Sequence, residues 1–165
     1  MTKSQVRLDV GAVVRAALEL LDEQGADGVS LRAIAGRLEV RMNTVLWHAK
    51  TKARLWELVA DAIVAGVGVD DLPEDPHERV RALARGYRRA LLAHRDGASV
   101  VSGTYAAEPA TLAFAEALVD ALLRGGRDER QAAWLCWTVI YFTLGLAQEE
   151  QSVPEPGDHR LARAV

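Results

Sequence analysis

The sequence predicts an all-α protein, and three features of its 165 residues favour that fold class. Apolar residues recur every three or four positions in each long segment, which is the spacing of one helix face. No stretch alternates convincingly between apolar and polar residues, as a half-buried strand would. Half of the residues are hydrophobic, so a sizeable core can form, which argues against global disorder.

Four helices are expected in the first part of the chain. The first spans residues 9–24 and ends at Gly25. The second is about two turns long and follows Ser30, whose hydroxyl can accept a hydrogen bond from an otherwise unpaired backbone N–H. A three-residue turn leads to a third short helix, and Thr51 precedes a longer fourth helix. Two short helices joined by a tight turn between two longer helices form the helix-turn-helix pattern.

The rest of the chain is expected to form a larger helical bundle. Residues 66–76 contain two glycines and two prolines, so they read as a linker before a helix that starts at Pro76. A short, glycine-punctuated segment follows at residues 95–104. Further helices are expected at residues 109–124 and 128–151.

These elements divide the chain into two expected domains, a head of residues 1–66 and a body of residues 67–165. The apolar run at residues 132–147 is shorter than the roughly 20 residues of a membrane-spanning helix, so a helix buried in the core is expected. No signal sequence is visible at the N-terminus, and Cys136 as the single cysteine rules out a disulfide framework. A cytoplasmic protein without membrane contact is expected.

Positive charge is concentrated around the predicted turn. The whole chain has a formal net charge of −3, but residues 30–54 carry six Arg and Lys side chains against the single acidic residue Glu39. Such a local excess on an acidic protein is typical of a site for a polyanion. A solvated helix face is the alternative, and charge alone does not decide between them.

The segment RMNTVLWHAKTK contains the third helix, which lies in the major groove in a helix-turn-helix. Asn43 can form a bidentate pair with adenine, and Met42 or Leu46 can contact thymine methyl groups. The polar and aromatic residues that follow suit phosphate oxygens. Trp47 can instead fill the bundle, and His48 can cap a helix. The expected DNA-binding residues are Arg32, Arg41, Met42, Asn43, Thr44, Leu46, Trp47, His48 and Lys52.

The stretch GAVVRAALELLDEQGADGVSLRAIAGRLEVRMNTVLWHAKTKARLWELVADAI resembles the DNA-binding domain of the TetR family of transcriptional regulators. The runs RRALLAHRDGASVVSGT and FTLGLAQEEQ resemble the ligand-binding core of the tetracycline repressors within that family. The resemblance covers about residues 9–151. It implies an all-helical homodimer whose heads bind double-stranded operator DNA and are moved apart when a small molecule enters the body. The chain stops where family members continue with the helices that usually build the dimer interface, so those C-terminal helices are expected to be missing.

Residues of the head can be compared with the family one at a time. Met42, Asn43 and Leu46 occupy base-reading positions but differ from the family's side chains, which implies a different operator. Glu39 replaces the usual turn glycine, and a positive φ there would cost on the order of 1 kcal/mol. The resemblance assigns DNA contacts to the positions of Arg32, Thr44, Trp47, His48 and Lys52.

The body departs further from the tetracycline repressors. Val101 stands at the magnesium-binding histidine, Gly68 at a tetracycline-binding histidine and Leu83 at a key asparagine, whereas Thr104 and Glu149 are retained. These changes argue against a magnesium–tetracycline effector, so an apolar or aromatic effector and no metal or other cofactor are expected. Each aromatic residue can equally be plain core. The expected effector pocket comprises Leu83, Tyr87, Val101, Thr104, Tyr105, Phe114, Trp134, Trp137, Tyr141 and Glu149.

Catalysis is not expected, because no catalytic constellation is visible. The run HRDG shares three letters with a kinase catalytic loop, but Val101 stands where that loop needs an asparagine. The leading hypothesis is a ligand-responsive transcriptional regulator, a repressor released from a palindromic operator by its effector. The alternative is a truncated interaction partner that does not bind DNA itself and pairs with a full-length relative.

Overall fold

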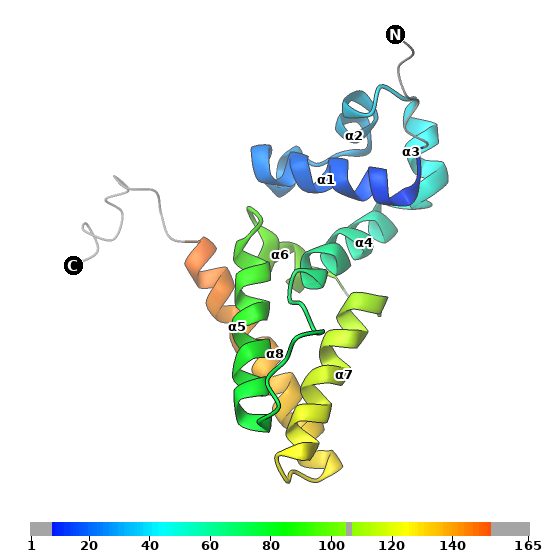
Figure 1. Cartoon of the computed structure of the whole chain (residues 1–165). Coiled ribbons are helices and arrows are strands. Elements are labelled where there is room, and N and C mark those ends of the chain that lie inside the picture. The colour runs from blue at the N-terminus through cyan, green and yellow to red at the C-terminus, as the bar shows by residue number, and fades with distance from the viewer. Residues whose placement is uncertain (1–7, 105–106, 153–165) are drawn as a thin grey trace, which may run out of the picture.

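The computed structural model describes residues 8–104 and 107–152 (Figure 1). Within these ranges it contains eight α-helices, one short 3-10 helix and no strand, which confirms the predicted all-α class. The elements in chain order are α1 (Val10–Gln24), η1 (Ala26–Gly28), α2 (Leu31–Arg37), α3 (Met42–Ala49), α4 (Lys52–Ala65), α5 (Pro76–Leu92), α6 (Gly97–Ser102), α7 (Pro109–Arg124) and α8 (Glu129–Gln151).

Local capping sets where the helices of the head begin. The Ser30 hydroxyl accepts a hydrogen bond from the Ala33 backbone N–H at 3.1 Å, and the Thr51 hydroxyl accepts one from the Arg54 N–H at 2.9 Å. Each such cap stabilises its helix by about 1 kcal/mol. The predicted starts of α2 and α4 are therefore confirmed.

The head is a small bundle in which α1, α2 and α3 lie above α4 (Figure 1). Its core residues are fully buried: Val13, Leu21, Ile34, Val45 and Val59. Val45 thus anchors the inner side of α3, and the turn before α3 fixes its direction. Glu39 in that turn has a φ of 53°, so this position keeps the left-handed backbone that glycine adopts most easily.

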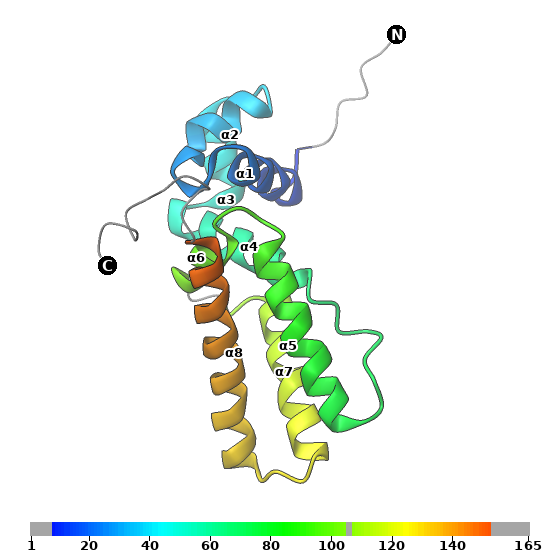
Figure 2. The ribbon, with the colours of Figure 1, turned by 90° about the vertical axis from the view of Figure 1, so that its left-hand side faces the viewer.

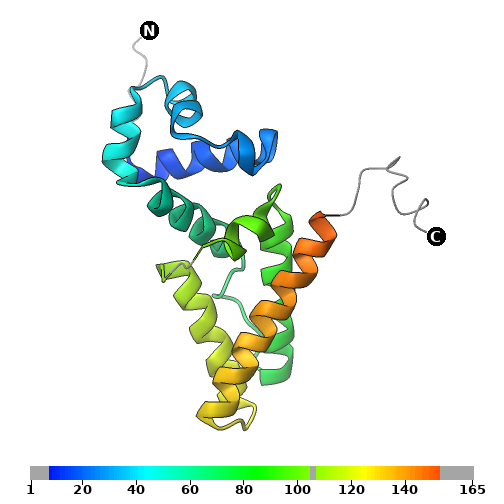
Figure 3. The ribbon, with the colours of Figure 1, turned by 180° about the vertical axis from the view of Figure 1, so that it is seen from behind.

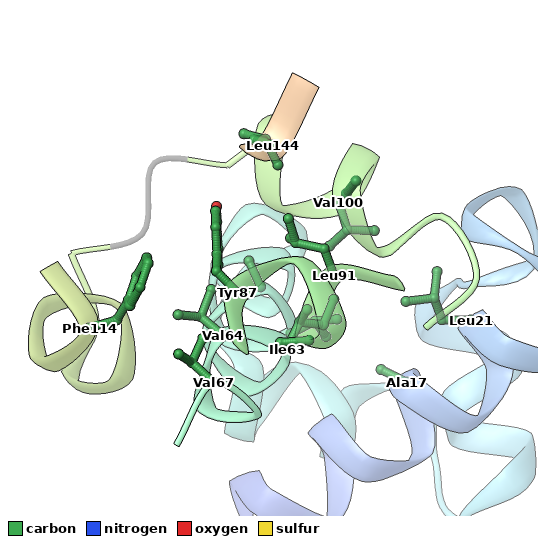
Figure 4. Packing of buried hydrophobic residues seen from close by; sticks show 14 of the residues in the cluster. Ala17, Leu21, Ile63, Val64, Val67, Tyr87, Leu91, Val100, Phe114 and Leu144 are labelled. Carbon is green, nitrogen blue, oxygen red and sulfur yellow. The ribbon is translucent and has the colours of Figure 1, made fainter. Parts of the chain in front are cut away.

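The body is formed by α5, α7 and α8, which run alongside one another, with α6 lying across their upper end next to α4 (Figure 2). Val64 of α4, Tyr87 of α5 and Phe114 of α7 meet in the core that joins the two parts (Figure 4). The Tyr87 and Phe114 rings are stacked, with centroids 4.7 Å apart. Residues 66–75 between α4 and α5 contain no helix, as predicted.

The predicted helix at residues 132–147 is confirmed as part of α8, but only one side of it is buried in the core. α8 lies at the edge of the body, in front of α5 and beside α7 in the view from behind (Figure 3). Cys136 and Thr143 face the bundle, whereas Trp134 is 68% exposed and Phe142 is 67% exposed. A run that is apolar all round indicates burial on every side, but the described bundle covers only one side of α8. No helix of the described ranges is long and apolar enough to cross a membrane.

Two short elements were not predicted, namely η1 and α6. The segment 95–104 that contains α6 has two glycines, and the N-cap residue Asp96 makes no side-chain cap hydrogen bond. Gln151 of α8 supplies an acceptor instead, 3.0 Å from the Ala98 backbone N–H. The turn before α6 is also closely packed, because a Cβ atom on Gly97 would lie 2.4 Å from the Leu91 carbonyl oxygen. Glycine is therefore needed where the turn after α5 enters α6.

Candidate nucleic-acid interface and ligand cavity

The outer side of α3 presents the side chains predicted to read bases. Arg41, Met42 and Asn43 are exposed at the N-terminal end of the helix, and Leu46 is half-buried. Val45 and Ala49 hold the opposite side in the core. The remaining predicted residues lie on α3 itself or on its packing partners, with Arg32 on α2 and Lys52 at the start of α4.

Trp47 projects from this surface and does not fill the bundle, because 68% of it is exposed. Its ring meets the edge of the His48 ring, with centroids 4.8 Å apart and planes at 89°. The Lys50 ammonium nitrogen lies 5.0 Å from the centroid of the Trp47 ring. At an exposed site such a cation–π contact contributes about 0.5–1 kcal/mol. The structure therefore joins two aromatic rings and a cation at the end of α3.

Two of the six basic side chains counted in residues 30–54 are engaged in ion pairs. Arg37 donates hydrogen bonds to Glu19 and Glu23 of α1, and this bonding holds the pKa of Glu23 below its usual range. Arg54 pairs with Glu57 and with Glu108 at the start of α7. The positive charge available to a partner is therefore smaller than the sequence indicated. In the described ranges, the basic side chains of this segment outside ion pairs are Arg32, Arg41, Lys50 and Lys52.

The backbone at Lys50 is strained. Its φ of 66° and ψ of −57°, with a hydrogen bond of 2.8 Å from the Thr51 N–H to the Ala49 carbonyl oxygen, define a rare γ-turn with positive φ. For a residue with a Cβ atom this conformation costs on the order of 1–3 kcal/mol. The turn is imposed because one residue must reverse the chain between buried Ala49 and the cap residue Thr51.

The body contains a cavity of about 430 Å³ between α4, α5, α6, α7 and α8. Its wall has no charged side chain in the described ranges. Val101 lines it with an isopropyl group, which cannot bind a metal ion. Six of the predicted effector residues line the cavity: Tyr87, Val101, Thr104, Phe114, Trp137 and Tyr141.

Aromatic rings dominate two parts of the cavity wall. Tyr87 and Phe114 stack at the inner part, and the rings of Trp137 and Tyr141 stack along α8 with centroids 5.5 Å apart. Burial, with a smaller contribution from Tyr141, raises the pKa of the Tyr87 hydroxyl, so this phenol stays neutral and can donate a hydrogen bond. The cavity can therefore hold a flat apolar molecule and bond one of its polar atoms.

Three other predicted effector residues do not line this cavity. Leu83 is fully buried in the core of α5, Trp134 lies nearer the N-terminal end of α8, and Glu149 is exposed. Tyr105 lies outside the described residues. Sequence reasoning missed several lining residues, among them Thr111, Leu144 and Gln148. The last two could have been found, because they follow Trp137 and Tyr141 at helical spacing on one face of α8.

The turn between α5 and α6 touches the head. Asp96 accepts a hydrogen bond of 2.9 Å from the Ala26 backbone N–H, and a Cβ atom on neighbouring Gly25 would lie 2.8 Å from the same carboxylate. Asp22 of α1 bonds His94 Nδ1 at 3.0 Å and the Arg95 N–H at 3.1 Å. The run HRDG is therefore a structural junction between the head and the body.

α4 is also tied to the start of α7. Asp61 accepts hydrogen bonds from the Thr111 backbone N–H at 2.8 Å and from the Thr111 hydroxyl at 2.9 Å. Arg54 and Glu108 form a two-pronged pair, which holds the pKa of Glu108 below its usual range. Since Thr111 lines the cavity, these contacts connect the cavity wall to the helix that leads into the head.

Two family models match this chain. Residues 13–59 match the model described as bacterial regulatory proteins, tetR family, and residues 71–165 match the model described as tetracyclin repressor-like, C-terminal domain.

Individual relatives agree with these matches. The tetracycline repressor protein class A from transposon 1721 of Escherichia coli is 36% identical over 149 residues, which is 88% of this chain and 68% of the relative. The crystal structure of BioQ with its double-stranded DNA operator has a TM-score of 0.81 at 31% identity, covering 96% of this chain and 93% of that one. A single-residue variant of TetR from Acinetobacter baumannii AYE, in complex with minocycline, has a TM-score of 0.81 at 34% identity, covering 95% and 90%.

Proposed function

This chain belongs to the TetR family of transcriptional regulators, which are not enzymes, and we propose that it is a repressor released from a palindromic operator by a small apolar or aromatic effector. The observation that carries the proposal is the pairing of two surfaces in one fold. One is the helix α3, with exposed hydrogen-bonding groups and flanking cations, and the other is a cavity without charged walls in the described ranges.

The head supports the DNA-binding half of the proposal. Asn43 and Met42 are exposed at the end of α3 that meets base edges in a helix-turn-helix. Trp47, His48 and Lys52 then face the flanking phosphates, which position the protein without reading sequence. Two identical heads would read half-sites about 34 Å apart, one turn of the duplex. The BioQ relative solved with operator DNA is consistent with this use of the fold.

The cavity supports the effector half of the proposal. An ionised ligand would be costly to bury against walls without charge, so the effector is a neutral apolar or aromatic molecule. No magnesium ion takes part, since valine occupies position 101. The minocycline complex of the A. baumannii relative is consistent with ligand binding in this fold.

Release from DNA would follow if the effector favours a second arrangement of the heads. Val101 belongs to α6, and Ala60 and Val64 belong to α4. A ligand therefore touches α4, which packs against α1 and α3, and α6, which packs against α4. The effector must bind one arrangement of the heads more tightly than the other. The free energy that couples effector binding to DNA binding is typically about 1–3 kcal/mol.

Pairing of the heads requires a dimer, and α8 offers the surface for it. Trp134, Tyr141, Phe142 and Leu146 are exposed along one side of this helix. A contiguous apolar stripe of this kind is typical of a protein interface. Homodimerisation through α8 is part of the proposal. The alternative of a partner protein without DNA binding is not favoured by any described feature of the head.

The test combines solution mass with DNA binding. We expect a dimer that binds a duplex from directly upstream of its own gene more tightly than a scrambled duplex, with affinity falling steeply between about 50 and 200 mM salt. Neutral two- and three-ring aromatic compounds should quench the fluorescence of Trp137 and weaken DNA binding. A monomer with feeble, sequence-blind binding would overturn the proposal and favour the interaction partner instead.

A further inference from the structure

Lys50 combines a strained backbone with a cation that has no carboxylate partner in the described ranges. Glycine would adopt the φ and ψ of its γ-turn without strain. The fold requires the turn, because Ala49 is fully buried and Thr51 caps α4. It does not require a lysine, since the Lys50 side chain is exposed.

Folding does not explain why this position carries a long cationic side chain. The contact with Trp47 is the interaction that its ammonium group makes within the described ranges. The free energy that an exposed cation–π pair contributes to stability is smaller than the free energy that a positive φ costs. Strain that is retained without a compensating contact tends to lie at functional sites.

The surroundings of the ammonium group indicate its partner. Trp47 is exposed, His48 meets its edge, and Lys52 and Arg41 have no carboxylate partner in the described part of the chain. No acidic residue occurs between Val40 and Glu57. A phosphate oxygen is the anion that fits several cations around an aromatic ring beside a DNA-reading helix.

We infer that Lys50 is a further contact to the DNA backbone, and that a lysine rather than a glycine is kept at this strained turn because its ammonium group lies beside Trp47 on the DNA-facing surface. This inference rests on the proposed DNA-binding function. Lys50 then contributes to the affinity for DNA but not to the recognition of bases, since an ammonium group on a phosphate contributes equally to all sequences.

The test uses two glycine variants, which separate the effect of backbone strain on stability from the effect of the side chain on DNA binding. Lys50→Gly removes the strain and the charge, so we expect a higher unfolding temperature together with about tenfold weaker DNA binding. Glu39→Gly is the matched control, because Glu39 also has a positive φ in an exposed turn of the head. It should raise the unfolding temperature too, but with DNA binding unchanged or stronger.

Two more variants and a salt series complete the experiment. Lys50→Arg keeps the charge and should retain affinity, whereas Lys50→Ala should lose as much as the glycine variant. The slope of log affinity against log salt should fall by about one for each head in the glycine and alanine variants. The probes are the duplex from upstream of the gene and its scrambled counterpart, and both should weaken equally.

Two outcomes would contradict the inference about Lys50. If the unaltered protein binds the upstream duplex in a salt-dependent manner and Lys50→Gly binds with the same affinity and slope, the inference fails while the proposed function stands. If the unaltered protein shows no salt-dependent binding to either duplex, the DNA-binding function fails and the inference fails with it.

Discussion

Trp47 in the head and Trp134 in the body are exposed to the same extent, 68% each, but their neighbours differ in kind. Trp47 has a lysine ammonium 5.0 Å from its ring and a histidine at its edge. Trp134 begins a stripe on α8 that continues through Tyr141 and Phe142, which are 63% and 67% exposed. Exposure of a large ring signals a partner in both places, and the neighbours indicate whether that partner is a polyanion or another apolar surface.

The largest expected effect comes from placing a charge in the apolar stripe. Phe142→Asp should convert a dimer into a monomer, with a loss of at least about 100-fold in association, because a buried unpaired carboxylate is costly. Sedimentation velocity measures this directly. Ala133→Asp is the control, since nine residues along an α-helix place it on the opposite side of α8. Equal masses for the two variants would show that the stripe is not the interface.

Trp47→Ala tests the other exposed ring. DNA affinity should fall by roughly tenfold, a loss of about 1.4 kcal/mol, whereas the free energy of unfolding should change by less than about 0.5 kcal/mol because the ring is exposed. The salt slope should not change, since tryptophan carries no charge. Chemical denaturation and DNA titration together separate these effects. A strongly destabilised variant with unaltered DNA binding would place Trp47 in the core of the head after all.

The rings that line the cavity form a third set, in which Tyr87 and Phe114 are buried whereas Trp137 and Tyr141 are 51% and 63% exposed. Gly145 lies on the cavity wall, and a Cβ atom there would meet no atom within 4 Å. Gly145→Leu should therefore fill part of the cavity and weaken binding of neutral aromatic probes by about tenfold. Helix stability should rise by about 0.5–1 kcal/mol. Gly145→Ala, which adds one methyl group, should retain most probe binding, and equal binding by all three proteins would exclude this cavity.

The smallest expected effect concerns the ion pair that joins the two regions. Arg54 lowers the pKa of Glu108 below its ordinary value of 4.5, so the pair stabilises the fold above that pH and is lost as pH falls through the lowered pKa. Glu108→Gln should lower the unfolding temperature at pH 7 by about 1–3 °C. Calorimetry from pH 7 to pH 3 should show this difference shrinking below pH 4.5. A difference that persists at low pH would assign the effect to packing.

The sequence predicted helix positions well where the signal is local. Ser30, Thr51 and Asp128 cap the helices that follow them, and Pro76 opens α5, so these starts could be read from single residues. α6 could not be read, because its own cap residue Asp96 makes no side-chain cap bond and the acceptor for the Ala98 N–H comes from Gln151 of α8.

Features that depend on distant residues were missed or misjudged. The pairing of Arg37 and Arg54 with carboxylates outside the segment reduces the available charge, and no local pattern reveals those partners. The exposed side of α8 could not be inferred either, since a helix that is apolar all round carries no directional signal. Lysine has no preference for positive φ, so the strain at Lys50 was invisible in the sequence.

The N-terminus of α7 has no side-chain cap of its own, and Asp61 of α4 supplies the acceptor instead. A borrowed cap makes the folding of one helix conditional on the docking of another. The first turn of α7 is complete only when α4 has docked, although 43 residues separate Ala65 from Pro109. By its position in the chain α4 therefore belongs to the head, but its docking is coupled to the folding of the body. A protein cut at residue 66 would divide a single folding unit rather than release two independent ones.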